Sequence, residues 1–312
     1  TYEVYGIGGY NGVYYPGGNT ATVYVGPRKP RDVRFETDDN GNGKLRIRWE
    51  YSSSYSEKSD FTATLERAEN DGAFTAIAET SDYNSSYLEE NDPIFDLSGE
   101  TPKLKNYRYR IRIRSLGVES VSDEITLGNG KETEWKARLY SNYDDSAKQW
   151  TGMTAWGDSR YGEVFGLVHK VGTSDWQQFY LRYSGNNKEL TGLEWGAAYE
   201  MYAVTLRDGN ISEVGKVWSG TYGPNQRRID TFYQCTSDKK LTNDVFVWSS
   251  STRFGSSKAE KFYTFRSENG GEYQLIDTND GGGYTDQNLE FGYTYSYVVQ
   301  VSENGVYSAY SE

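Results

Sequence analysis

Residues 289–297 read Leu-Glu-Phe-Gly-Tyr-Thr-Tyr-Ser-Tyr, and the chain carries three further versions of this stretch. In each version a glycine follows an anchor tyrosine by ten residues: Tyr2 and Gly12, Tyr107 and Gly117, Tyr199 and Gly209, Tyr295 and Gly305. The anchors lie 105, 92 and 96 residues apart, which is the length of one small domain. Four equal spacings in one chain indicate a repeated domain rather than chance.

Each anchor tyrosine opens a predicted β-strand, because apolar and polar residues alternate after it. The clearest case runs from Tyr107 to Arg114, where an apolar residue at every second position alternates with an arginine. A strand with this pattern has one buried face and one charged, solvated face. The Asp208-Gly209 and Asn304-Gly305 pairs then predict tight hairpin turns, because such turns need residues that tolerate positive φ.

A second repeated block precedes three of the anchors. Six positions match between the first and last copies, where Arg67, Glu69, Asn70, Gly72, Phe74 and Ile77 correspond to Arg266, Glu268, Asn269, Gly271, Tyr273 and Ile276. The block predicts another hairpin, with asparagine and glycine at its tip and an aromatic residue on its second arm. In the middle copy the spacing to Trp176 and Phe179 places His169 at the position of the two arginines.

The 312 residues have room for three domains of about 90–100 residues and a leading fragment. The predicted limits are 1–27 for a partial repeat that holds only the closing hairpin, and 28–128, 129–221 and 222–312 for three domains. An insertion near Asn91 to Thr101 lengthens the first domain. Apolar content is 36% and aromatic content 16%, which together suit small sandwiches with thin, aromatic cores.

Three features recur in these domains: a tryptophan that ends the second strand (Trp49, Trp156 and Trp248), an Arg-x-Glu-Asn-x-Gly-x-aromatic hairpin and a Leu-x-x-Gly-x-x-Tyr corner. Together they resemble tandem fibronectin type III domains of bacterial secreted or cell-surface proteins. The resemblance implies an all-β fold of tandem immunoglobulin-like (fibronectin type III) β-sandwiches. It also implies that three tyrosine-corner hydroxyls bond back to the upstream backbone, those of Tyr107, Tyr199 and Tyr295.

Net charge and hydropathy disfavour two function classes. A net charge of −12 argues against nucleic-acid binding, which needs a basic field. The arginines between Tyr107 and Arg114 are the exception, and Glu66 and Glu69 are predicted to offset them. No apolar run approaches the roughly 20 residues that span a bilayer, so no membrane insertion is expected.

The sequence offers few residues suited to catalysis or to binding a cofactor or metal. His169 is the only histidine and Cys235 the only cysteine, and they fall in different repeats. We therefore expect no catalytic residue, no cofactor and no enzymatic activity. Asp38 to Gly43 echoes the first half of a calcium loop, but Trp49 stands where the closing glutamate is needed. A hairpin tip is the favoured interpretation there and at the weaker Asp277 to Gly283, so no metal site is predicted.

Aromatic side chains are the predicted binding chemistry. Tyr10, Tyr14 and Tyr15 lie in a glycine-rich segment where no core demands them, and they form the candidate aromatic contact surface. Packing on the adjacent domain is the alternative. The sequence predicts a non-enzymatic extracellular or cell-surface protein with a structural, spacer or adhesion role, with assembly into a filament or surface layer as a further expectation. The alternative function is a carbohydrate-binding accessory module of a secreted enzyme.

Residues 1–27 hold a closing hairpin without the strands that it would complete, and a lone hairpin is marginal in water. Either the chain is cut from a longer repeat array or the hairpin docks within the chain, or it adds to the sheet edge of a neighbouring copy. The expected partner is a protein or a second copy bound through this N-terminal hairpin. A glycan is a further candidate, and nucleic acid is not expected.

Overall fold

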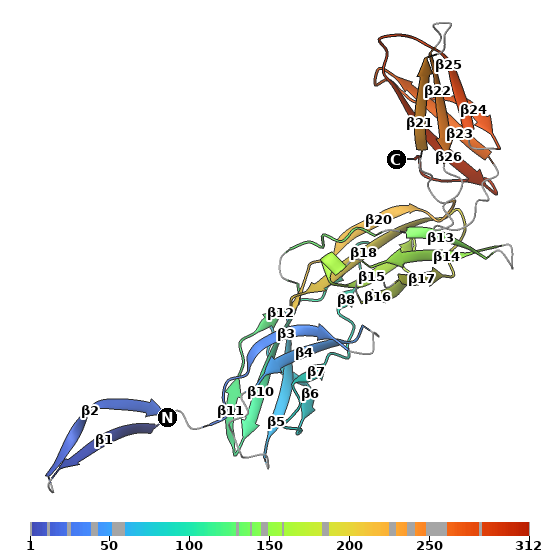
Figure 1. Ribbon diagram of the computed structural model, residues 1–312. Coiled ribbons are helices and arrows are strands. Elements are labelled where there is room, and N and C mark those ends of the chain that lie inside the picture. Colours follow the sequence, from blue (N-terminus) through green and yellow to red (C-terminus); the bar gives the residue numbers. More distant parts are fainter. Residues whose placement is uncertain are drawn as a thin grey trace. The chain divides into compact units, whose positions relative to one another are not determined.

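A computed structural model describes residues 2–10, 13–23, 26–38, 43–51, 60–128, 131–137, 139–144, 149–157, 159–182, 187–224, 229–235, 241–247, 261–280 and 283–311. These residues form antiparallel β-strands joined by turns, with one short 3₁₀ helix at Ser159–Tyr161 (Figure 1). The chain divides into two compact units. The first comprises Thr1–Asp96, Lys103–Lys131 and Asp208–Ser212, and the second comprises Leu97–Pro102, Glu132–Arg207 and Glu213–Glu312.

The first two strands form a two-stranded sheet of their own. β1 (Tyr2–Tyr10) pairs antiparallel with β2 (Val13–Val23), and the register shifts once between Tyr5 and Ile7. Among the strands that the structure describes, β1 and β2 pair only with each other.

The first sandwich follows in the same unit. One sheet contains β3 (Arg31–Thr37), β4 (Leu45–Glu50) and β7 (Tyr87–Glu89), and the other contains β6 (Thr75–Thr80), β5 (Thr62–Glu69), β10 (Tyr107–Ser115), β11 (Val118–Val121) and β12 (Ile125–Thr126). β8 (Phe95–Asp96) lies in the predicted insertion and pairs with β9 (Lys103–Leu104), which follows it. Trp49 is buried between the two sheets, and the apolar residues of β10 alternate with its arginines as the sequence predicts.

The second sandwich belongs to the second unit, apart from β19. β13 (Leu139–Asp144), β14 (Gln149–Trp156) and β17 (Asn187–Thr191) form one sheet, and β16 (Trp176–Leu181), β15 (Glu163–Lys170), β18 (Ala198–Arg207), β19 (Asn210–Ile211) and β20 (Gly215–Thr221) form the other. Trp156 ends the second strand of this sandwich as predicted, but its side chain is 38% exposed. Trp135, which precedes the first strand, is buried in this core instead.

The third sandwich repeats the arrangement. β21 (Ile229–Cys235), β22 (Leu241–Val247) and β25 (Gly283–Leu289) form one sheet, and β24 (Gln274–Asn279), β23 (Lys261–Glu268), β26 (Tyr295–Glu303) and β27 (Val306–Tyr307) form the other. Phe262, Val299 and Val301 form its described core. Trp248, the remaining tryptophan predicted to end a second strand, lies outside the described residues.

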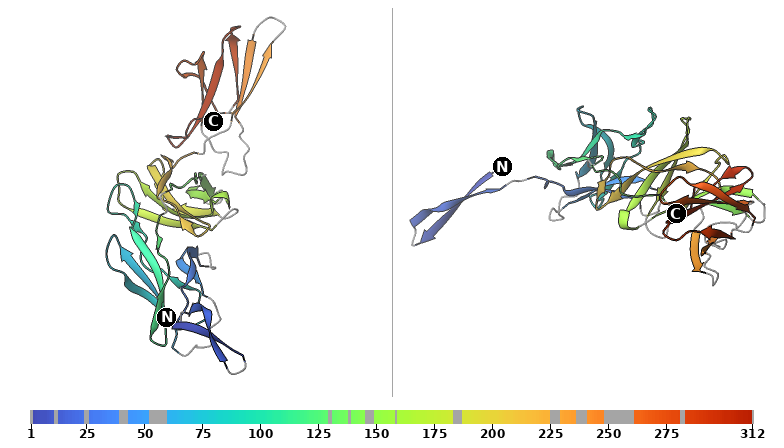
Figure 2. Two further views of the ribbon diagram at one scale, coloured as in Figure 1. Left: turned by 90° about the vertical axis from the view of Figure 1, so that its left-hand side faces the viewer. Right: turned by 90° about the horizontal axis from the view of Figure 1, so that it is seen from above.

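All three sandwiches share one strand order. The first, second and fifth strands form one sheet and the remaining strands form the other, so that each sandwich has two layers (Figure 2). This is the division of an immunoglobulin-like sandwich, which confirms the predicted all-β class of tandem fibronectin type III-like domains. The predicted domain limits stay a prediction, because Leu97–Pro102 and Asp208–Ser212 group with the other unit by contacts.

Candidate functional site

Two of the three predicted corner tyrosines bond to the backbone upstream. The Tyr199 hydroxyl accepts a hydrogen bond from the Glu194 N–H at 2.8 Å, and the Tyr295 hydroxyl accepts one from the Glu290 N–H at 3.0 Å. Each bond holds the turn through which the chain passes from one sheet to the other. These hydroxyls are therefore part of the scaffold.

Tyr107 differs from the other two predicted corner tyrosines. The structure gives its hydroxyl no matching bond to a described residue upstream, and its ring instead lies 4.3 Å from the Arg67 guanidinium carbon. The sequence before it also differs, because Thr101 stands where the other corners have leucine. The inserted β8–β9 pair directly precedes this turn and replaces the shorter corner.

Two sandwiches carry a buried cluster that joins their sheets, which we call the inter-sheet lock. In the first sandwich Arg67 donates to both Glu90 oxygens at 2.9 Å, and the Tyr109 hydroxyl donates to the same carboxylate at 2.9 Å. In the third sandwich Arg266 donates to both Asp286 oxygens at 3.0 Å, and the Tyr297 hydroxyl donates at 2.8 Å. The arginine and tyrosine come from one sheet, and the carboxylate comes from the other sheet or the residue that follows it.

The locks are electrostatically self-contained. The side chains of Glu90 and Asp286 are only 2% and 3% exposed. Burial lowers the pKa of Arg67, but hydrogen bonds to Asp92 and Glu90 outweigh this effect and raise it overall. Burial, with Glu90 as a neighbour, raises the pKa of Tyr109. Each carboxylate is therefore buried and paired inside its own sandwich.

The second sandwich replaces all three members of the lock by apolar residues. Val168 is paired with Met201, as Arg67 is paired with Tyr109 and Arg266 with Tyr297. Leu190 precedes its anchor tyrosine by nine residues, as Asp286 does. Val168, Leu190 and Met201 all lie in the hydrophobic core of this sandwich. The matched arginines, and the tyrosines two residues after the anchors, gave a sequence signal for the lock. The carboxylates did not align because of the insertion.

His169 does not take the place of the arginines, and that prediction is wrong. It pairs with Glu200 on the opposite face of the strand, where its ring stacks on Trp176 with centroids 3.9 Å apart. Its Nδ1 lies 3.0 Å from the Thr173 carbonyl oxygen. Val168 pairs with Gln177, nine residues on, whereas Arg67 pairs with Thr75, eight residues on. The hairpin turn is therefore one residue longer in the second sandwich. For this reason the spacing in the sequence matched the arginines to His169 instead of Val168.

Three of the four arginines of β10 form ion pairs within the first sandwich, and Arg108 bonds to Glu124 at 3.0 Å. Arg110 and Arg112 bond to Glu66 at 2.6 and 2.8 Å, and Arg112 also bonds to Glu119 at 2.6 Å. Burial raises the pKa of Glu66, but the two arginines outweigh it and lower that pKa overall. The predicted offset by Glu66 is present, and this face is a ladder of ion pairs rather than an open anion site.

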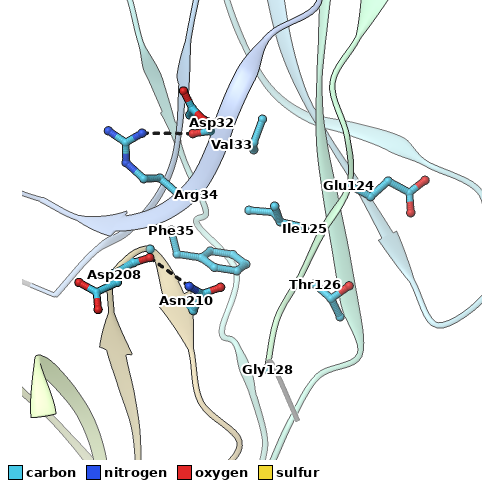
Figure 3. A pocket seen from close by; sticks show the side chains of 11 residues that line it. Asp32, Val33, Arg34, Phe35, Glu124, Ile125, Thr126, Gly128, Asp208 and Asn210 are labelled. Atoms are coloured by element: carbon cyan, nitrogen blue, oxygen red, sulfur yellow. Dashed lines mark hydrogen bonds between the residues drawn. The ribbon is translucent and has the colours of Figure 1, made fainter. Parts of the chain in front are cut away.

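A shallow hollow of about 550 Å³ lies in the first unit (Figure 3). The Phe35 ring forms part of its wall beside Ile125, and charged residues from three segments lie around it: Asp32, Arg34, Glu124 and Asp208. The Phe35 N–H donates to the Gly209 carbonyl at 3.0 Å, and Arg34 donates to the Asp32 carbonyl at 3.2 Å. The mixed charge and these internal bonds indicate a packing hollow rather than a catalytic cleft.

Neither calcium candidate is supported by the described residues. The Asp38 carboxylate accepts a hydrogen bond from the Lys44 N–H at 3.0 Å, as at a hairpin tip, and residues 39–42 lie outside the description. Asp277 accepts a hydrogen bond from the Asn279 side chain. Within the described ranges no group of three histidine, cysteine, aspartate or glutamate side chains is placed to hold a metal ion.

The predicted aromatic contact surface lies on the β1–β2 hairpin. The backbone of Tyr10 pairs with Val13, and Tyr14 and Tyr15 pair with Gly9 and Gly8. The structure does not describe the side chains of this hairpin, so the contact surface stays a prediction.

A different aromatic surface, which the sequence reasoning missed, lies on the third sandwich. We call it the aromatic platform, and it comprises Tyr263, Phe265, Leu275, Val298, Tyr307 and Tyr310. Phe265 pairs with Leu275 on one side and with Val298 on the other. Leu275, Tyr307 and Tyr310 are each about half exposed, at 53%, 48% and 49%. The signal was present in β23, where apolar residues occupy both faces of the strand.

Comparison with known proteins adds little to these observations. No family model matches the chain. No curated protein matches it either. Among solved structures, the FN1–FN3 domains of chicken CNTN1 are similar over 92% of this chain and 97% of that chain, with 11% sequence identity and a TM-score of 0.24. The fold assignment therefore rests on the strand order itself. Separately, the described part of the chain has no helix with the length and apolar character needed to cross a membrane.

Proposed function

We propose that the chain is a non-enzymatic structural, spacer or adhesion protein that acts outside the cell or at its surface. The observation that supports this most is the use of its buried charges. Glu90 and Asp286 are bound to arginine and tyrosine inside their own sandwiches. Such groups stabilise a scaffold and are not available as an acid–base pair.

A screen for hydrolysis tests this role. The intact chain is incubated with polysaccharide and ester substrates, and we expect no turnover above the buffer control. Turnover that a single carboxylate substitution abolishes would show that the chain is an enzyme.

Carbohydrate binding is a second candidate function, and the aromatic platform is the observation that favours it. Exposed aromatic rings on a flat sheet offer faces on which sugar rings stack, and the tyrosine hydroxyls add hydrogen-bonding groups at their edges. The largest apolar patch on a monomeric protein is often a binding site.

A further inference from the structure

The aromatic platform is not required by the fold. The same sheet face of the first sandwich carries arginines paired with Glu66. In the second sandwich this face is apolar but buried, with Leu167 and Val204 fully covered and Phe165 8% exposed. Among the described residues only the third sandwich has this face both apolar and open. A feature present in one of three like domains is better explained by a ligand than by folding.

The rings of the platform are held in place before any ligand arrives. Tyr263 and Tyr307 have ring centroids 5.4 Å apart, and Phe265 and Tyr310 have theirs 5.3 Å apart. The Tyr307 hydroxyl shares a hydrogen bond with Tyr263, which raises the pKa of Tyr307. Because each ring rests on another, binding would cost less side-chain entropy than it would for isolated surface tyrosines.

The open area fits a small ligand better than a second protein. Taking about 200 Å² for a whole aromatic side chain, the half-exposed Tyr307 and Tyr310 leave roughly 200 Å² open, and Leu275 adds to this. A stable protein interface takes about 800 Å² from each partner. A second copy of this chain would also bring another net charge of −12, and like charges oppose association.

The chemical groups on the aromatic platform further restrict the class of ligand. It combines apolar rings with three phenol hydroxyls, and Gln300, which pairs with Tyr263, adds an amide. Acidic ligands are disfavoured by the negative charge of the chain. An uncharged sugar chain matches both properties, because sugar rings present C–H groups on their faces and hydroxyl groups at their edges.

We propose that the aromatic platform binds a short stretch of an uncharged polysaccharide, with its sugar rings stacked on Tyr307 and Tyr310. This proposal rests on the carbohydrate-binding candidate function and names the site for it.

Affinity electrophoresis of the full chain tests the proposal. Native gels contain one uncharged polysaccharide each: hydroxyethyl cellulose, laminarin, galactomannan, xylan or soluble starch. Sedimentation with cellulose and chitin powders covers the insoluble forms. We expect at least one probe to retard or sediment the chain, and the double variant Tyr307→Ala, Tyr310→Ala to bind it at least tenfold more weakly. The variant Tyr307→Phe, Tyr310→Phe keeps the rings and should lose less.

The matched control changes two equally exposed tyrosines of the same sandwich that lie in its turns, Tyr273→Ala and Tyr293→Ala, at 47% and 46% exposure. We expect its binding to stay within twofold of the original chain, and all variants to keep the same melting temperature. Absence of binding to every probe would remove the carbohydrate function itself. Binding that the platform variant retains, or that the control loses equally, would place the site elsewhere. A dimer in light scattering that only the platform variant abolishes would identify a second copy as the occupant.

Discussion

Leu116 has a backbone conformation that leucine seldom adopts. Its φ is 49° and that of Gly117 is 74°, as in a type I′ turn between β10 and β11. The equivalent turns have Asp208 and Asn304 at this position, with φ of 50° and 49°. A left-handed conformation costs an ordinary residue roughly 1–2 kcal/mol, whereas asparagine tolerates it. Because Leu116 is 56% exposed, little packing opposes a change.

We therefore expect Leu116→Asn to raise the free energy of unfolding by about 1 kcal/mol. Urea denaturation followed by fluorescence measures it. The reverse substitution at the matching turn, Asn304→Leu, is the control and should lower stability by a similar amount. An unchanged or less stable Leu116→Asn variant would show that the turn is not strained.

The inter-sheet lock gives a second prediction, because the chain contains both polar and apolar solutions to one packing problem. Glu90→Leu alone removes the buried carboxylate that Arg67 and Tyr109 share and leaves Arg67 with the exposed Asp92. Breaking a buried pair costs up to about 3–5 kcal/mol. The triple variant Arg67→Val, Glu90→Leu, Tyr109→Met installs the set that the second sandwich uses. We expect the triple variant to be more stable than the single one, because no buried charge remains unpaired. Denaturant unfolding of both variants decides it, and a triple variant less stable than Glu90→Leu would refute the idea.

At the level of single elements, Gly166 shows how β15 accommodates an aromatic neighbour. It pairs with Phe179 on β16, and a Cβ added to Gly166 would lie only 1.9 Å from the Phe179 ring. Overpacking of this kind typically costs about 1–3 kcal/mol.

Gly166→Ala should therefore destabilise the second sandwich by about 1–3 kcal/mol, and Phe179→Leu added to it should restore part of the loss. Thermal unfolding of the single and double variants measures both effects. Gly172→Ala, at a turn glycine with open space around its Cβ position and φ of 84°, separates backbone strain from steric overlap. If Gly166→Ala unfolds at the same temperature as the original chain, the packing of the Phe179 ring does not require glycine at position 166.

The strands show what a sequence can and cannot predict. Alternation fixed the buried face of β10, and the Asp-Gly and Asn-Gly pairs located the turns, because both depend on neighbouring residues alone. The position of His169 failed because one extra turn residue shifts strand pairing, and local spacing does not record pairing. The aromatic platform was missed because β23 has apolar residues on both faces. Only the folded structure shows which face of the strand is covered.

At the scale of the whole chain, one strand order supports three different sheet faces. The first is an ion-pair ladder, the second is buried and the third is an open aromatic surface. The shared elements are those that the fold needs, such as the bonds of Tyr199 and Tyr295 to the backbone. The outward sheet faces are not needed for the fold and can differ between domains. We therefore expect a binding site to be present in one domain and not in all three repeats.

The last prediction concerns the β1–β2 hairpin. Its strands pair only with each other among the described strands, and the outer edges of such a hairpin offer unpaired backbone groups to another sheet. Strand addition on a neighbouring copy would join chains into a polymer, whereas a hairpin that belongs to a preceding repeat or docks within the chain would not. Deleting residues 1–27 and measuring the mass of both forms by light scattering separates these cases. We expect the intact chain to be a monomer and the deletion to remain one, with the same unfolding midpoint for the sandwiches. A large polymer that falls to monomers on deletion would contradict this and assign the hairpin to assembly.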